Sequence, residues 1–376
     1  MKHIIKLFLC MLLCSSCMTH GTVCTDSVDI DVSNFSPLSD IFDGYRYIRL
    51  QRPDSCVLRS INKIVPTDSL LFIQDASVIY ICDYDGTFLK KIDRQGHGRG
   101  EYLKINDWAV HGGKLWILDS QKSRLLSYGY DGTLAREYVL PDTFHSLWML
   151  EDGNVFLCAQ QSNDGLYNFI MYDTDSERVT KRFAGFRTNN SCTESGFHDF
   201  IGQCSDTLIV TNRFDNTVYN LTRDDYSPRF TFAFNTEEQL PVNREGLDYV
   251  QLADMTQFKN VVKHVYLYHQ SESQIVLGYY LFDDYGDSYY LTKINHDGTQ
   301  RTARLLVTVD SDFPYASPVI AQHNGEFVSF LQASQILNIE KYAKLDLFTN
   351  AGLGIDDNPV IFFHRIRPSD KPSNRK

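Results

Sequence analysis

Short hydrophobic runs separated by polar turns follow one another along the chain from Tyr45 onward. Residues 79–92 and 115–138 each hold two such runs around an Asp-Gly turn, Asp85-Gly86 in the first and Asp131-Gly132 in the second. The two aspartates are 46 residues apart (131 − 85). A strand, turn and strand recurring at about 40 to 50 residues is typical of a β-propeller blade, and Asp-Gly between hydrophobic runs is a strong hairpin signal, for which we expect a type I′ turn.

Six units of this kind fill the chain, near residues 70–92, 108–140, 144–183, 197–234, 264–309 and 317–364. Their strands are often apolar on both faces, as in Leu115-Trp-Ile-Leu118. A strand between two neighbouring blades is buried on both sides, whereas a sandwich strand would alternate. The pattern therefore predicts an all-β fold, a six-bladed β-propeller. Ring closure predicts that Tyr45–Leu50 pairs with Val360–Phe363.

One stretch interrupts the strand pattern. Apolar residues in 241–259, among them Leu247, Val250 and Phe258, recur at helical spacing, which predicts a short helical insertion between the fourth and fifth units. A second helical stretch is expected at 333–345.

The N-terminus has the features of an export signal. Lys2 and Lys6 precede the apolar run Leu7–Leu13, which is too short to span a bilayer. Leu13-Cys14-Ser15-Ser16-Cys17 resembles a bacterial lipobox, with Cys14 where that pattern prefers leucine. The resemblance implies lipidation of Cys17; an ordinary secretory signal cut nearby is the alternative. We therefore expect a signal peptide over 1–16, a lipid anchor and tether over 17–40, a propeller over 41–367 and a basic tail over 368–376.

The charge of the chain argues against one class of partner. Its 376 residues carry a net charge of −11, and a mature chain without Lys2 and Lys6 carries 34 basic and 47 acidic residues, or −13. A nucleic-acid-binding protein needs a basic face, so we expect no DNA or RNA partner.

Six cysteines follow Cys17. In an oxidising compartment the best pair by sequence is Cys192 with Cys204, which bracket a polar loop. Cys82 and Cys158 lie inside apolar strand patterns, where a free buried thiol is expected. The sequence contains no CxxC motif, so a redox motif or zinc knuckle is not predicted.

A glycine-rich segment follows the first unit: Gly96-His-Gly98-Arg-Gly100-Glu101-Tyr102. It resembles NHL-type repeats and, more closely, the six-bladed β-propeller lipoproteins of gut Bacteroidota, whose blades join through a G-x-G-x-G-E-[YF] loop. The resemblance covers about residues 42–366 and implies a six-bladed propeller of unassigned activity. We expect a structural inter-blade loop in which the glycines supply positive φ and Glu101 holds the loop, because a phosphate-binding loop would need a helix immediately after it.

The titratable residues form no local motif of a known site. His264 and His269 are five apart in a predicted strand, so they should not share a metal. Asp83-Tyr-Asp85-Gly86 lacks the further ligands of a calcium loop, and Asp283–Asp287 is expected to be an exposed acidic loop. We assign no catalytic or cofactor-binding residue, and no cofactor.

Two function classes remain open. The first is a monomeric, envelope-anchored propeller, expected at the outer membrane and facing the periplasm, that binds a protein, peptide or glycan on one face. The second is a metal-dependent propeller hydrolase or lyase with calcium or zinc over the central channel. Such a site takes one ligand from each of several blades, so the sequence alone does not show it. Three or more carboxylate or imidazole groups converging within metal-binding distance at the channel mouth would favour the enzyme.

Overall fold

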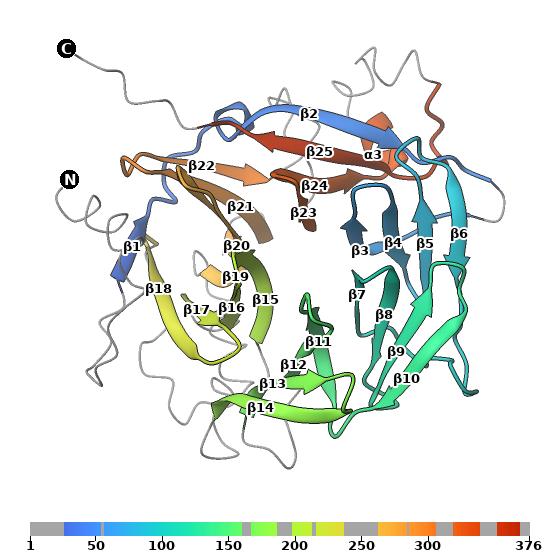
Figure 1. The fold of residues 1–376 in the computed structure, drawn as a ribbon. Coiled ribbons are helices and arrows are strands. Elements are labelled where there is room, and N and C mark those ends of the chain that lie inside the picture. The colour runs from blue at the N-terminus through green and yellow to red at the C-terminus, as the bar shows by residue number, and fades with distance from the viewer. Residues whose placement is uncertain are drawn as a thin grey trace.

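The computed structural model describes residues 26–53, 56–159, 167–185, 198–212, 216–236, 262–283, 286–305, 319–338 and 352–368. These residues form six sheets arranged as blades around a central axis, all antiparallel except for one parallel strand pair (Figure 1). The predicted six-bladed propeller is confirmed.

In each blade the first strand lies nearest the axis, and the blades are numbered here along the chain. Blade one contains β3 (Ile61–Pro66), β4 (Leu71–Asp75), β5 (Val78–Cys82) and β6 (Phe88–Ile92). Blade two contains β7 (Asp107–His111), β8 (Lys114–Asp119), β9 (Arg124–Gly129) and β10 (Leu134–Val139). Blade three contains β11 (Phe144–Met149), β12 (Val155–Ala159), β13 (Tyr167–Asp173) and β14 (Arg178–Gly185).

Blade four contains β15 (His198–Cys204), β16 (Thr207–Asn212), β17 (Thr217–Leu221), β18 (Tyr226–Phe234) and, as a fifth strand, β1 (Asp26–Ile30). Blade five contains β19 (Val262–Gln270), β20 (Gln274–Asp283), β21 (Gly286–Asn295) and β22 (Gln300–Leu305). Blade six contains β23 (Ala321–His323), β24 (Glu326–Leu331), β25 (Val360–Ile366) and β2 (Phe42–Arg49).

The hydrophobic core lies between the blades, as strands apolar on both faces require. On β8, Leu115 and Ile117 pack into the cluster shared with blade one. Trp116 and Leu118, which alternate with them, pack into the cluster shared with blade three. Successive side chains of a strand point to opposite faces, so a central strand of a blade contributes to two cores at once.

The ring closes through strands from opposite ends of the chain. β2 pairs antiparallel with β25, with Tyr45 opposite His364 and Arg49 opposite Val360. Figure 1 shows the blue N-terminal strand alongside the red C-terminal one. The predicted closing pair is confirmed.

The predicted tether over 17–40 is wrong from Asp26 onward. β1 pairs in parallel with β18, so that Val28 lies opposite Phe232, and both Val28 and Ile30 are buried. Ser36 donates a backbone hydrogen bond to Thr302, and the 3-10 helix η1 (Leu38–Asp40) buries Leu38 against blade five. The strand was not predicted because the segment is rich in polar residues and only two of its apolar side chains face inward.

The helices are few in the described part of the chain. The helix expected near residue 333 begins there as α3 (Ala333–Asn338), whereas 339–345 and the insertion predicted over 241–259 lie outside the described residues. No helix among the described residues is long and apolar enough to cross a membrane.

The Asp-Gly turns differ from the expected type. Gly86, Gly132 and Gly298 have φ between 82° and 83°, while the aspartate before each does not have a positive φ. A type I′ turn needs positive φ at both central residues; here a single left-handed glycine follows a tight turn instead. Asp131 illustrates the role of the acid, because its Oδ1 accepts hydrogen bonds from the backbone N–H and hydroxyl of Thr133.

Candidate functional site

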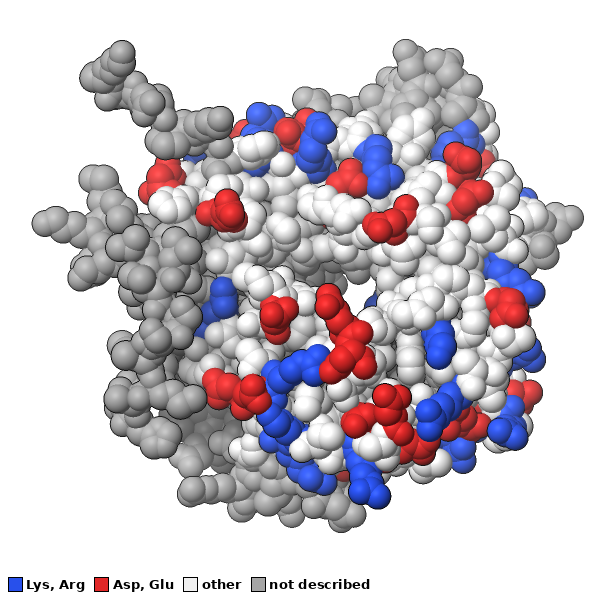
Figure 2. All heavy atoms as spheres, viewed as in Figure 1, with Lys and Arg blue, Asp and Glu red and all other residues white. Residues whose placement is uncertain are grey.

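The first strands of the blades surround a central channel. The cavity has a volume of about 790 Å³ and is lined by residues of β3, β7, β11, β15, β19 and β23. Figure 2 shows this face of the propeller hollowed at its centre, with acidic and basic side chains at the rim.

An ion pair links three blades at the channel wall. Lys63 Nζ lies 2.6 Å from Asp107 Oδ1 and donates a second hydrogen bond to the carbonyl oxygen of Trp108. The other oxygen of Asp107 accepts a hydrogen bond from the backbone N–H of Leu147 at 2.9 Å. Blades one, two and three thus meet at one carboxylate, and the charge of Lys63 is compensated within the protein.

A second carboxylate lies between two imidazoles. Asp199 of β15 has His264 Nε2 of β19 at 3.4 Å and His145 Nε2 of β11 at 3.9 Å. The side chain of His264 is buried. Each residue lies near the start of its strand, so all three belong to the same end of the channel. Sequence reasoning missed this cluster because its members are more than 50 residues apart.

His264 and His269, which were predicted not to share a metal, have different partners. Two register shifts interrupt the pairing of β19 with β20 between Val262 and Leu267. His264 approaches Asp199, whereas His269 Nδ1 is hydrogen-bonded to Gln322 Oε1 at 2.9 Å. Burial lowers the pKa of His269. Among the described residues, no three His, Cys, Asp or Glu side chains are arranged to hold a metal ion.

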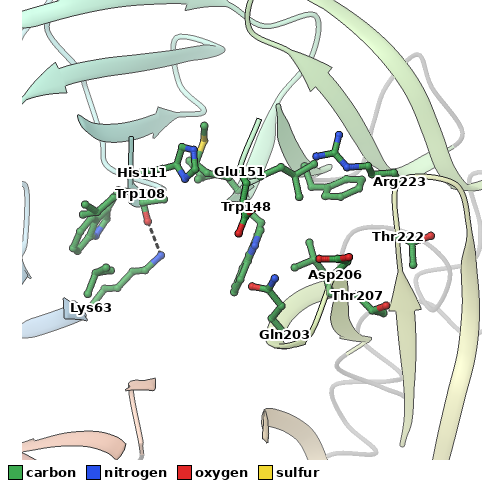
Figure 3. A pocket seen from close by; sticks show the side chains of 18 of the residues that line it. Lys63, Trp108, His111, Trp148, Glu151, Gln203, Asp206, Thr207, Thr222 and Arg223 are labelled. Atoms are coloured by element: carbon green, nitrogen blue, oxygen red, sulfur yellow. Dashed lines mark hydrogen bonds between the residues drawn. The ribbon is translucent and has the colours of Figure 1, made fainter. Parts of the chain in front are cut away.

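At the other end, the channel opens into a groove between blades two, three and four. The groove has a volume of about 670 Å³ and shares Lys63, Val65, Leu147, Trp148 and Gln203 with the channel, so the two are continuous. Figure 3 shows Trp148 extending into the groove between Lys63 on one side and Gln203 and Asp206 on the other. Its indole is half-buried and packs against Phe200, with ring centroids 6.1 Å apart.

Charged side chains from hairpin turns form the rim of the groove. Arg223, on the β17–β18 turn, pairs with Asp152 on the β11–β12 turn, and this hydrogen bond lowers the pKa of Asp152. Lys181 pairs with Asp224 and also donates to the carbonyl oxygen of Arg223 at 2.8 Å. These contacts fix the two turns against each other and leave the groove with a preformed edge.

The residues predicted to form the inter-blade loop lie between β6 and β7, away from the groove. Glu101 Oε2 accepts a hydrogen bond from the N–H of Gly98 at 2.7 Å, and Tyr102 is fully buried with its hydroxyl donating to Ser77. Burial raises the pKa of Tyr102 to about 12.

The three glycines of this loop have different roles. Only Gly100 has a positive φ (67°), so the expectation that all three supply it is wrong. A Cβ on Gly96 would lie 2.1 Å from Glu101 Oε2, and one on Gly98 would lie 3.0 Å from the same oxygen. These two glycines make room for the carboxylate that holds the loop. A strand, not a helix, follows at β7, and the loop therefore lacks the helix N-terminus of a phosphate site.

The cysteine predictions are tested only in part. Cys82 and Cys158 are fully buried free thiols, as predicted, and burial raises the pKa of each. Cys204 ends β15 and is partly exposed, but Cys192 lies outside the described residues, so their disulfide stays a prediction. Cys17 also lies outside them.

Comparison with known proteins gives a family and a fold. A family described as a domain of unknown function, DUF4934, matches residues 26–365. No curated protein matches the chain. A predicted exported protein from Bacteroides fragilis NCTC 9343 superimposes with a TM-score of 0.71 at 17% identity, covering 91% of this chain and 99% of the other.

A second solved structure is more distant. A member of the DUF4221 family from Bacteroides vulgatus gives a TM-score of 0.55 at 10% identity, covering 88% of this chain and 98% of its own. At these identities the likeness concerns the fold alone.

Proposed function

The chain belongs to the DUF4934 family, and from this premise we propose that it is an exported, lipid-anchored propeller that binds a protein, peptide or glycan in the groove between blades two, three and four. The signal-like segment before Cys17 and the Bacteroides fragilis protein of the same fold, itself described as a predicted exported protein, support an extracytoplasmic location. No catalytic step is part of the proposal.

The observation that carries the proposal is the groove itself. It is continuous with the channel, has Trp148 half-exposed inside it, and is bordered by turns held together by the Arg223–Asp152 pair. Ligand sites are usually preformed concave surfaces with aromatic side chains and a few polar groups, and tryptophan is enriched among residues that dominate binding energy.

A binding experiment with the mature chain tests this function. The protein carrying Cys17→Ala, to prevent lipidation, is immobilised and exposed to envelope extract and to a glycan array. A specific ligand should be retained by this protein and lost or weakened with Trp148→Ala, while Leu89→Ala, on the exposed outer strand of blade one, should retain it. Thermal unfolding of each variant verifies that the fold persists. Equal retention by both variants would exclude the groove as the binding site.

A further inference from the structure

The groove contains two acidic side chains that form no salt bridge within the described part of the chain. Glu151, on the β11–β12 turn, and Asp206, on the β15–β16 turn, both line it and are both exposed. Neither forms a side-chain hydrogen bond to a described residue. The pKa of Arg223 is raised mainly by its hydrogen bond to Asp152, and Asp206 adds to this shift, so Asp206 only shares a cation that Asp152 already pairs. We infer that the groove recognises a basic side chain, arginine or lysine, of an extended polypeptide; this inference rests on the binding function proposed above.

The basic residues of the groove do not cancel this charge. Lys63 is paired with Asp107, and Arg223 is paired with Asp152. The remaining acid of the rim, Asp224, is paired with Lys181. Once these three pairs are set aside, Glu151 and Asp206 are the formal charges that remain on the groove, together with the titratable ring of His111. The groove therefore complements a cation.

The indole of Trp148 adds a second element of recognition. It lies in the groove between Lys63 and Asp206, and its ring nitrogen makes no hydrogen bond to a described residue (Figure 3). Cations pack favourably over a tryptophan ring, and arginine does so more often than lysine because its guanidinium is planar and weakly hydrated. Figure 3 shows Asp206 on the side of Trp148 that faces away from Lys63, so a guanidinium stacked on that side of the ring would approach this carboxylate.

The surrounding face carries both acidic and basic side chains (Figure 2), and several of the acids lie on its hairpin turns. The hairpin turns on this side of the blades carry Asp68, Asp131, Asp175, Glu272 and Asp297 in addition to the groove acids. Asp131 and Asp297 accept hydrogen bonds within their own turns, whereas Asp68 lies beside His323 and Asn324. With a net charge of −11 the whole chain favours the approach of a cationic partner, and such steering weakens as salt is added.

Matched peptides provide the test. The probe is a fluorescently labelled peptide that alternates arginine with glycine and serine, and its counterpart replaces each arginine by citrulline, which has nearly the same shape and no charge. Affinities for the mature Cys17→Ala protein are measured by anisotropy at low and physiological salt. We expect the arginine peptide to bind and the citrulline peptide to bind about ten-fold more weakly or not at all.

Two double variants locate the effect. Glu151→Gln with Asp206→Asn should weaken binding of the arginine peptide about ten-fold, since it removes two partly solvated charge contacts. The control, Asp29→Asn with Asp356→Asn, also removes two carboxylate charges, from exposed positions outside the groove, and should change binding less than two-fold. Trp148→Leu should weaken the arginine peptide more than the citrulline peptide.

The outcomes separate this inference from the proposed function. Equal binding of the two peptides, or equal weakening by the two double variants, overturns the recognition of a basic side chain. Retention of a glycan, or of an uncharged polypeptide, by the wild-type groove overturns it as well while leaving the binding function in place. A groove variant that binds every probe and every retained ligand as the wild type does overturns both.

Discussion

At the scale of single residues, His364 is the most strongly perturbed histidine among those described. It is fully buried on β25, its Nε2 lies 3.1 Å from the hydroxyl oxygen of Ser329, and its ring packs against Phe42 and Phe362. Burial lowers its pKa to about 3. A histidine kept neutral in the folded state and free to protonate in the unfolded state makes stability depend on pH.

We predict that this dependence appears below the ordinary histidine pKa. The unfolded state binds the additional proton. The stability associated with the neutral His364 is therefore fully present above about pH 6.5 and is lost as the pH falls toward 3. At pH 5 the loss should be about 2 kcal/mol, since one pKa unit corresponds to about 1.4 kcal/mol. Urea unfolding at pH 7.5 and pH 5 measures it.

The matched variants are His364→Gln and His97→Gln, the second at an exposed position of the inter-blade loop. The difference in unfolding free energy between the two pH values should shrink by about 2 kcal/mol in the first variant and stay as in the wild type in the second. An unchanged difference in His364→Gln would show that another group causes the pH dependence.

A second residue marks a close approach between two blades. A Cβ on Gly202 of β15 would lie 2.2 Å from the carbonyl oxygen of Tyr268 on β19, and backbone cannot move aside as a flexible side chain can. We predict that Gly202→Ala lowers the unfolding free energy by roughly 2 kcal/mol or more, as overpacking in a core does. Gly112→Ala is a poor comparison because of its positive φ, whereas Glu272→Ala, at an exposed turn position without a positive φ, should have little effect. A melting temperature of Gly202→Ala equal to that of Glu272→Ala would contradict this prediction.

At the scale of elements, β1 shows how a strand can be overlooked. Its alternating pattern buries Val28 and Ile30 and exposes Ser27 and Asp29. Ile30→Ala should lower the unfolding free energy by about 2 kcal/mol or more, and Asp29→Ala should change it by less than about 0.5 kcal/mol. Chemical denaturation of the two variants measures the difference. Similar values for both would mean that β1 contributes little to the stability of blade four.

Most of the other strands could be predicted, because the sequence patterns that identify them are local. Asp-Gly turns and runs such as Leu115–Leu118 identify hairpins and buried strands without reference to the rest of the chain. β3 was not predicted, because the exposed Asn62 and the channel-lining Lys63 interrupt its apolar pattern. β1 was not predicted because its partner, β18, is about 200 residues away.

The candidate site was not predictable in the same way. Trp148, Glu151 and Asp206 come from the first strand and turn of two successive blades, and only ring geometry brings them to one groove. One feature of the sequence could have pointed to them. Trp148, Glu151 and Asp206 each lie within two residues of the end of the first strand of a blade. The position of a residue within the repeat therefore predicts the face, while its neighbours across the groove follow from the fold.

At the scale of the whole molecule, the pairing of β2 with β25 makes the ring a single cooperative unit. A chain starting at residue 41 and one starting at residue 53 both lack β1 and η1, but only the first keeps β2. We predict that the second aggregates or melts at a clearly lower temperature, because it exposes the edge of β25 and the apolar side chains that β2 covers. Differential scanning calorimetry compares them, and equal melting temperatures would contradict closure by β2.

Lipidation also belongs to this scale. We predict that globomycin-sensitive processing and membrane retention both disappear in Cys17→Ala, because that residue would carry the lipid. Membrane fractionation with Cys24→Ala as the matched control measures it. A Cys17→Ala protein that still fractionates with membranes would refute lipidation at this residue.

The docking of β1 on blade four has a consequence for where such an anchored protein could act. Cys17 lies only nine positions (26 − 17) before Asp26, the first residue of β1. Even fully extended, a segment of this length reaches about 30 Å. With a lipid at Cys17, the edge of blade four would stay within about this distance of the bilayer surface. The groove, which blade four borders, would then also stay near the membrane. Its partner would have to be another resident of the membrane surface, or a molecule that passes within a few nanometres of it.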